Sequence, residues 1–232
     1  MAKRRRAMHA GVRASPRAAR RPAASTTGGP SLRVVLIALA AVGLFGVIAF
    51  VALLGGSTAR AYSCGELLQP PAEDPGPAGV TTPNQASTHV APGTRIRYAS
   101  CPPTSGQHFN ARGAGPIPAR LYGPEADAGP GGWVHNLEHG YVVALYRCDG
   151  GTCPSSDELE SLRSFATNGP PTESAAACGI RSKVLVARFD QMSTRFALLA
   201  WDRALLLDAF DARRAQAFAE RSIDATAPER AC

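Results

Sequence analysis

The sequence predicts an α+β domain, with one mainly antiparallel sheet packed with two helices, preceded by a single transmembrane helix. Three observations predict this arrangement. A long apolar segment follows a basic N-terminal tail, the strand-like and helix-like segments after it do not alternate as βαβ units, and all six cysteines lie beyond the apolar segment. Without βαβ alternation, one sheet with helices packed on it is the expected architecture.

The N-terminal part divides into a basic tail, residues 1–33, and an apolar segment, residues 34–56. The tail contains nine Lys or Arg and no Asp or Glu, whereas residues 34–56 contain no charged side chain. Residues 34–54 are all small or apolar, and a helix that crosses a bilayer needs about 20 such residues. The positive-inside rule then puts the disordered tail in the cytoplasm, near anionic lipid headgroups of the cell membrane, and the C-terminal domain on the extracytoplasmic side.

The apolar segment has two alternative interpretations. A cleavable signal peptide would use the small residues of Ala59-Arg60-Ala61, but the apolar region of a signal peptide is usually only about 7–15 residues long. A lipoprotein anchor at Cys64 is disfavoured because the preceding Ala61-Tyr62-Ser63 is a poor match to the residues that precede a lipid-modified cysteine and lies well past the apolar segment. A single-pass membrane anchor is therefore the preferred prediction.

The formal net charge of +7 belongs to the tail. Residues 57–232 contain 16 Lys or Arg and 18 Asp or Glu, which gives this part a net charge of −2. A nucleic-acid-binding domain concentrates Lys and Arg on its folded part, so nucleic acid is excluded as a partner. The sequence identifies no protein partner.

Residues 57–93 are rich in Pro and Gly and are predicted to form a linker, so that the folded domain occupies residues 94–232. Residues 95–98, 133–137, 140–146, 183–189 and 196–201 are typical of strands, because they are rich in β-branched, aromatic and other apolar side chains. Ser155 and Glu158 form a capping-box pattern before a helix. Asp211 is a suitable N-cap for a last helix that continues through Ser222.

The six cysteines predict disulfide bonds, because all lie in the part expected on the oxidising side of the membrane: Cys64, Cys101, Cys148, Cys153, Cys178 and Cys232. The sequence does not choose among their pairings. Cys148 and Cys153 are the one local candidate, since the intervening Asp-Gly-Gly favours a tight turn. A zinc ribbon is disfavoured because the paired two-residue Cys spacings are absent.

Four histidines of the domain are the candidate functional residues: His89, His108, His135 and His139. His135 and His139 are four residues apart, which puts them on one face of either a helix or a strand. Neutral imidazoles are common ligands of zinc and copper, often three to an ion. We predict a transition-metal site, zinc or copper, formed by His108, His135 and His139, with His89 or Glu138 as a fourth ligand or supporting partner.

Other roles for these residues stay open. The histidines and the carboxylate can form a buried hydrogen-bonded network without a metal, or they can act in general acid–base catalysis, with Glu138 as the candidate base. Ser105 could act as a nucleophile with His108, but no Gly-x-Ser-x-Gly elbow is present. Cys101 could act as a nucleophilic thiol, but it is expected to form a disulfide. Trp133 and Trp201 are expected in the core.

Two motifs resemble those of the bacterial family called domain of unknown function 3105: Pro102-Pro103-Thr104-Ser105-Gly106-Gln107-His108 and Trp133-Val134-His135-Asn136-Leu137-Glu138-His139-Gly140. His89, Ala200-Trp201 and Pro228-Glu229 are also similar, and the resemblance covers roughly residues 85–230. Gln107 stands where many members have Pro. The resemblance implies a membrane-anchored or exported protein without an assigned activity. Because all four histidines fall on motif positions, it also favours a functional site.

These observations support three hypotheses. The first is a single-pass membrane protein whose extracytoplasmic domain binds a transition metal. The second is an extracytoplasmic metal-dependent hydrolase in which Glu138 acts as general base on a metal-bound water. The third is a metal-free structural or interaction module of the cell envelope. The sequence indicates no substrate pocket, so we prefer the first.

Overall fold

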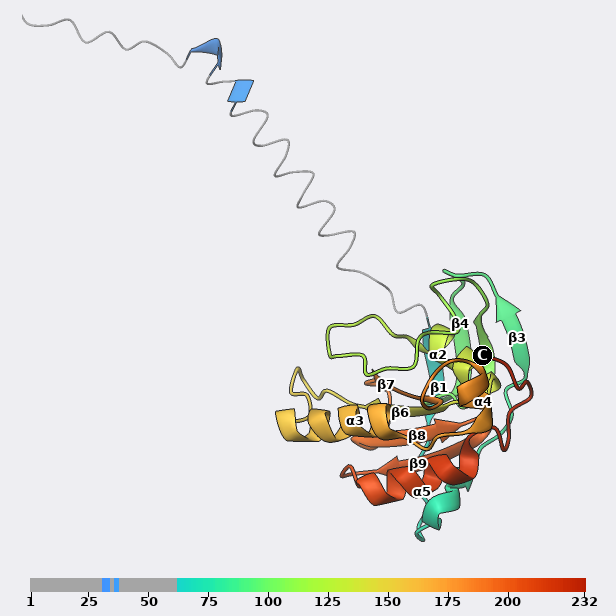
Figure 1. Cartoon of the computed structure of the whole chain (residues 1–232). Coiled ribbons are helices and arrows are strands. Elements are labelled where there is room, and N and C mark those ends of the chain that lie inside the picture. Colours follow the sequence, from blue (N-terminus) through green and yellow to red (C-terminus); the bar gives the residue numbers. More distant parts are fainter. Residues whose placement is uncertain (1–30, 34–35, 38–61) are drawn as a thin grey trace, which may run out of the picture. The chain divides into compact units, whose positions relative to one another are not determined.

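The computed structural model describes residues 31–33, 36–37 and 62–232. The chain divides into two compact units, Met1–Ser57 and Thr58–Cys232, and the second contains the folded domain (Figure 1). The predicted tail and apolar segment lie outside the described residues, except for residues 31–33 and 36–37. Within the described ranges, no helix is both long and apolar enough to cross a membrane.

The domain has the predicted α+β architecture, built on a five-stranded mixed sheet. Its strands lie in the order β2 (Val80–Thr81), β9 (Arg203–Leu207), β8 (Phe196–Ala200), β6 (Val142–Tyr146) and β7 (Val184–Arg188). Neighbouring strands are antiparallel except β6 and β7, which are parallel. The predicted strands over residues 140–146, 183–189 and 196–201 correspond to β6, β7 and β8.

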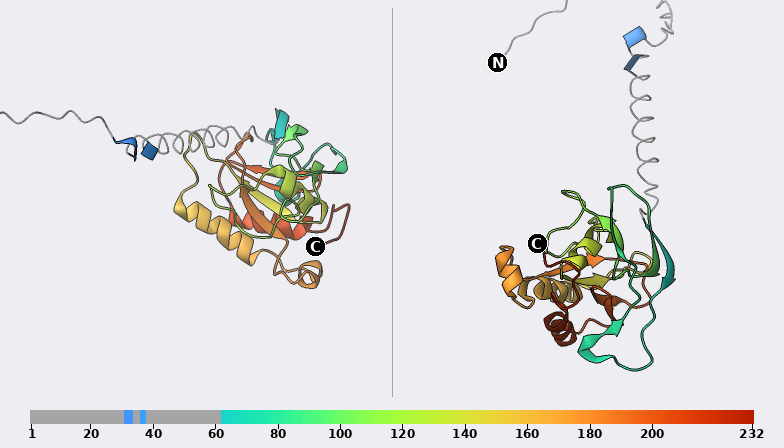
Figure 2. Two further views of the ribbon diagram at one scale, coloured as in Figure 1. Left: turned by 90° about the horizontal axis from the view of Figure 1, so that it is seen from above. Right: turned by 90° about the vertical axis from the view of Figure 1, so that its right-hand side faces the viewer.

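The central sheet is covered on both faces. Val142 and Ala144 of β6 belong to a core that includes α3 (Ser156–Asn168) and α5 (Ala212–Ser222). Val143 and Leu145 belong to a second core, which includes residues of α2 (Pro130–Glu138) and β4 (Ile96–Cys101). Because both faces of β6 are buried, its sequence is continuously apolar rather than alternating. The views in Figure 2 show the domain from two further sides.

The prediction of a linker over residues 57–93 is corrected, because parts of this range form strands in two small parallel sheets. β1 (Tyr62–Leu67) pairs with β4, and β3 (Ser87–Val90) pairs with β5 (Gly106–Phe109). The domain therefore includes the chain from Tyr62 onward, together with a short 3-10 helix, η1 (Gly76–Ala78). Proline has no backbone N–H to donate to a neighbouring strand, but β1 and β3 contain no proline and can therefore pair.

The two predicted helices correspond to α3 and α5. Ser155 caps α3, because its Oγ accepts from the Glu158 N–H at 3.3 Å while the Glu158 side chain accepts from the Ser155 N–H at 2.9 Å. Asp211 caps α5 by accepting from two backbone N–H groups. Residues 62–232 contain two further α-helices, α2 and the five-residue α4 (Glu173–Ala177), which the sequence pattern did not predict.

The strand predicted over residues 133–137 is wrong, because these residues belong to α2. Every residue of α2 is buried, so the segment lacks the polar stripe that marks a surface helix. Gly131 and Gly132 also lower its helix propensity. A Cβ at Gly131 would overlap the Phe109 ring, and one at Gly132 would lie 2.8 Å from the Ala114 carbonyl oxygen. Close packing on β5 and the following loop therefore overrides the local preference.

All six cysteines form disulfide bonds, which confirms that prediction: Cys64–Cys101, Cys148–Cys153 and Cys178–Cys232. Cys148–Cys153 is the predicted local pair. Cys64–Cys101 connects β1 to β4, and Cys178–Cys232 connects the end of α4 to the C-terminal residue. The last of these bonds holds the C-terminal segment against the domain.

Candidate metal centre

The candidate site forms where β3, β5 and α2 meet. In the parallel β3–β5 pair, His89 stands opposite His108, so the two side chains are neighbours. α2 packs on β5. Glu138 of α2 and the C-cap residue His139 follow His135 by three and four residues, so the three side chains share one face of the helix. Residues from three distant parts of the sequence thus come together, and all except His89 are buried.

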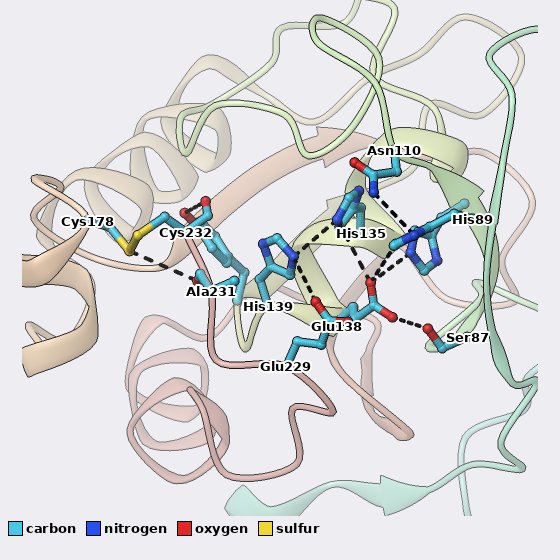
Figure 3. A network of polar contacts seen from close by, with 12 residues as sticks. Ser87, His89, Asn110, His135, Glu138, His139, Cys178, Glu229, Ala231 and Cys232 are labelled. Carbon is cyan, nitrogen blue, oxygen red and sulfur yellow. Dashed lines mark hydrogen bonds and ion pairs between the residues drawn. A yellow bond between two sulfur atoms is a disulfide. The ribbon is translucent and has the colours of Figure 1, made fainter.

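Three imidazole rings form a nearly equilateral triangle. The ring centres of His89 and His108 are 4.8 Å apart, those of His89 and His135 are 5.0 Å apart, and those of His108 and His135 are 4.9 Å apart. Oε2 of Glu138 lies 3.2, 2.9 and 3.9 Å from Nε2 of His89, His108 and His135, respectively. Ligand atoms of these four residues, the inner group, all lie within 4.8 Å of one another and could hold a metal ion. Figure 3 labels His89, His135 and Glu138 of this group.

Backbone carbonyls orient two of the three rings. Nδ1 of His108 lies 2.8 Å from the Gly106 carbonyl oxygen, and Nδ1 of His135 lies 2.7 Å from the Phe109 carbonyl oxygen. Because a carbonyl oxygen only accepts, each Nδ1 carries a proton, so Nε2 is the ring atom of each that is left to face Glu138. Nε2 of His108 lies 2.9 Å from Oε2 of Glu138, a contact that either a proton or a metal ion between the two atoms satisfies. Metal-binding histidines are typically oriented by hydrogen bonds like those of the two Nδ1 atoms.

The protonation states of the inner group suit a cation. Burial raises the pKa of Glu138, but the hydrogen bond from Ser87 and the neighbouring His108 and His89 outweigh this effect and lower the pKa. Burial is the main cause that lowers the pKa of His135. At neutral pH the group therefore contains an ionised carboxylate and a neutral imidazole, the forms in which both side chains bind metal ions.

The inner group is open to solvent on the side of His89. The His89 side chain is 41% exposed, whereas His108 and Glu138 are almost completely buried. His89 is therefore the member of the inner group that solvent reaches most easily. Asn110 lies above His89 and donates from Nδ2 to its Nδ1 at 3.2 Å, so Nε2 carries the ring proton and donates to Glu138 at 3.2 Å (Figure 3). Binding of an ion at Nε2 requires this proton to move to Nδ1 or to leave the ring.

His139 lies beside the inner group, not within it. Its Nε2 is 3.1 Å from Nε2 of His135 and 3.6 Å from Oε2 of Glu229. His139, Glu138 and Glu229 form a second set whose ligand atoms lie within 4.8 Å of one another. The structure thus gathers all four predicted histidines in one area, but it groups His89 with His108 and His135, whereas the sequence pattern favoured His139 as the third ligand.

Three residues of the site were not predicted as functional. Ser87 donates from Oγ to Oε1 of Glu138; it is two residues before His89 in a strand, and this spacing puts it on the same face. Asn136 accepts from the Ile117 N–H at 2.9 Å and donates to the Ile117 carbonyl at 2.8 Å, which ties the preceding loop to α2. Glu229 comes from the far end of the chain; the family resemblance included Pro228-Glu229, but no local pattern indicates that this residue lies near His139.

The serine nucleophile considered from the sequence is not assembled. Ser105 Oγ is buried and accepts from the Gln85 N–H at 2.9 Å. Both nitrogens of His108 are engaged elsewhere, with Gly106 and Glu138.

Trp201 belongs to the core as predicted, and its ring lies edge-on to His108 with ring centres 6.5 Å apart.

Comparison with known proteins gives one match. No curated protein and no solved structure matches the chain. A family model described as a protein of unknown function (DUF3105) matches residues 89–232, a range that contains every member of the inner group as well as His139 and Glu229. The chain therefore belongs to the DUF3105 family, as the two histidine motifs indicated.

Proposed function

We propose that the domain is an extracytoplasmic metal-binding module of a single-pass membrane protein and that it holds one transition-metal ion in the inner group. The ligands are Nε2 of His89, His108 and His135 together with a carboxylate oxygen of Glu138. The single observation that carries this proposal is the convergence of three imidazoles and a buried carboxylate, with ligand atoms within 4.8 Å of one another.

The distances support a four-coordinate ion. Bonds of about 2.0–2.1 Å to a tetrahedral ion separate neighbouring ligand atoms by roughly 3.3–3.4 Å. The observed separations between Glu138 Oε2 and the three Nε2 atoms, 3.2, 2.9 and 3.9 Å, lie on both sides of this value. Small rotations of the side chains would therefore complete the coordination shell.

The donor set favours zinc and, after it, copper(II). Three imidazole nitrogens and one carboxylate oxygen suit both ions, whereas copper(I) prefers thiolate and thioether sulfur. Within the described residues every cysteine is in a disulfide, and Met192 is buried in the core. No sulfur ligand is thus offered to the inner group.

The location proposed for the domain rests on the sequence and the disulfides. A basic tail before an apolar segment supports an N-terminus in the cytoplasm, and three disulfides support an oxidising compartment for the domain. We prefer a binding role to hydrolysis because Glu138, the candidate general base, is already in contact with the histidines of the inner group.

Metal analysis of the purified full-length chain tests the proposal. After incubation with zinc and removal of loosely bound ions, we expect at least one zinc per chain in the wild type. Loss of a hydrogen bond that supports a metal ligand typically weakens metal binding by about 10- to 100-fold. His108→Gln and His135→Gln each remove a ligand itself, so each should weaken zinc binding by more than this. His9→Gln, a substitution of the tail histidine, is the matched control and should change nothing. A folded wild-type chain without zinc or copper would refute the proposal.

A further inference from the structure

His139 has no satisfactory partner once a metal occupies the inner group. His135 Nδ1 is committed to the Phe109 carbonyl, so only its Nε2 can bind the ion. That same Nε2 is the nearest acceptor of His139, at 3.1 Å. When it binds metal, His139 Nε2 retains only Glu229 Oε2, 3.6 Å away, which is too long for a hydrogen bond. Its Nδ1 is buried without a partner in the described part of the chain.

Glu229 is held next to His139 by a dedicated set of contacts. Its backbone N–H donates to the Glu138 carbonyl at 3.1 Å, which satisfies a carbonyl at the C-terminal end of α2. Two residues later, the Ala231 carbonyl accepts from the fully buried Lys183 Nζ at 3.1 Å. The Cys178–Cys232 disulfide then closes this C-terminal segment onto α4 (Figure 3). The fold therefore holds the backbone of Glu229 beside the end of α2, where its carboxylate can reach His139.

The same Lys183 also connects this segment to α2. Its Nζ donates to the His139 carbonyl at 2.9 Å and pairs with Oδ1 of Asp224 at 2.8 Å. The ammonium is thus paired with Asp224, and its other two partners are the carbonyl oxygens of His139 and Ala231. The imidazole of His139 and the exposed carboxylate of Glu229 face each other at the rim of the site, with Nε2 and Oε2 3.6 Å apart.

We propose that the set His139, Glu229 and Glu138 is a second metal site, which binds a divalent transition-metal ion at the rim, with Glu138 shared between the rim ion and the inner ion. This inference rests on the proposed function, because an ion in the inner group is what leaves His139 without its neighbour. Ligand atoms of the three residues lie within 4.8 Å of one another. Paired ions with shared carboxylates typically lie about 3.5–4 Å apart.

The rim ion differs from the inner ion in exposure. Glu229 is 54% exposed at its side chain, and His139 is 10% exposed. With three protein ligands, the rim ion has a coordination position open to water or to an oxygen-bearing ligand. It should therefore bind more weakly and exchange faster than the inner ion.

Equilibrium dialysis of the chelator-treated full-length chain against zinc tests the proposal. We expect two zinc ions per chain in the wild type, with the second bound more weakly. Glu229→Gln and His139→Gln should each reduce the count to one and leave the tighter ion in place. Glu160→Gln, which removes an exposed carboxylate on α3, is the matched control and should retain two. With cobalt in place of zinc, the wild type should show magnetic coupling between two ions by electron paramagnetic resonance, and Glu229→Gln should not.

The outcomes separate the two proposals. One zinc per chain that neither Glu229→Gln nor His139→Gln affects would overturn the rim site and leave the inner site intact. Two zinc ions that persist in both variants would also overturn it, because the second ion would then bind elsewhere. No zinc in the folded wild type would refute the proposed function itself. Circular dichroism spectra equal to that of the wild type confirm that each variant is folded.

Discussion

The three disulfides close loops of very different length, and this predicts a ranking of their contributions to stability. Cys178–Cys232 joins residues 54 positions apart, whereas Cys148–Cys153 joins residues five apart. A disulfide stabilises a protein largely by reducing the conformational entropy of the unfolded chain. This reduction grows with the logarithm of the length of the loop that the bond closes. The first bond should therefore contribute about 4 kcal/mol to the free energy of unfolding, and the second about 2 kcal/mol.

Urea unfolding of two double variants measures this difference. We expect Cys178→Ser/Cys232→Ser to lose about 4 kcal/mol and Cys148→Ser/Cys153→Ser about 2 kcal/mol, each relative to the oxidised wild type. The fluorescence of the two tryptophans reports the transition, since Trp133 and Trp201 both lie in the core.

Equal losses, or a larger loss for the short loop, would refute the entropic reasoning. A loss well below 2 kcal/mol for the long loop would refute it as well, because the contacts of Lys183 with Asp224 and Ala231 belong to the folded state and do not change the entropy of the unfolded chain.

Three further predictions concern the surroundings of the site. Asn136→Ala removes two hydrogen bonds to Ile117 and should cost about 2 kcal/mol in urea unfolding, and a loss below about 0.5 kcal/mol would contradict it. Lys183→Met leaves Asp224 without its buried cation and should cost about 3 kcal/mol; an unchanged unfolding midpoint would show that this ion pair is not needed. The pKa of His135 is lowered on folding, so below about pH 6.5 the unfolded chain binds more protons, and the metal-free protein should lose stability as the pH falls from 7.5 to 5.5. His135→Gln should reduce this loss, and a midpoint that rises at pH 5.5 would contradict the direction of the shift.

The parts of the fold that local chemistry specifies could be predicted from the sequence. The capping box at Ser155 and the N-cap at Asp211 each act within four residues, and both helices begin where these patterns indicate. The apolar segments of β6, β7 and β8 are buried on both faces, so their composition alone marks them as strands. The turn between Cys148 and Cys153 is equally local.

The parts that long-range contacts specify could not be predicted in this way. α2 is helical despite two glycines, because its close packing on Phe109 and Ala114 excludes larger side chains. β1 and β3 lie in a segment rich in proline, and their pairing depends on partners more than 15 residues away. The pairing of Cys178 with Cys232 likewise depends on the path of the C-terminal segment.

In the candidate site, too, local spacing could be predicted from the sequence and long-range contacts could not. The spacing of His135 and His139 indicated a shared face, and the structure has that face at the C-terminal end of α2, together with Glu138. Which histidine joins His108 and His135 depends on the register of β3 against β5, and that register brings in His89. Sequence spacing carries no information about this register, so it favoured His139.

The most direct test of the account is an anomalous difference map, recorded at the zinc absorption edge, from crystals of the chain grown with zinc. We predict a peak within about 2.0–2.2 Å of Nε2 of His89, His108 and His135 and of a carboxylate oxygen of Glu138. A map without a peak in the inner group, or with zinc bound only at other residues, would contradict the central claim that this buried group of three histidines and a glutamate is a metal site.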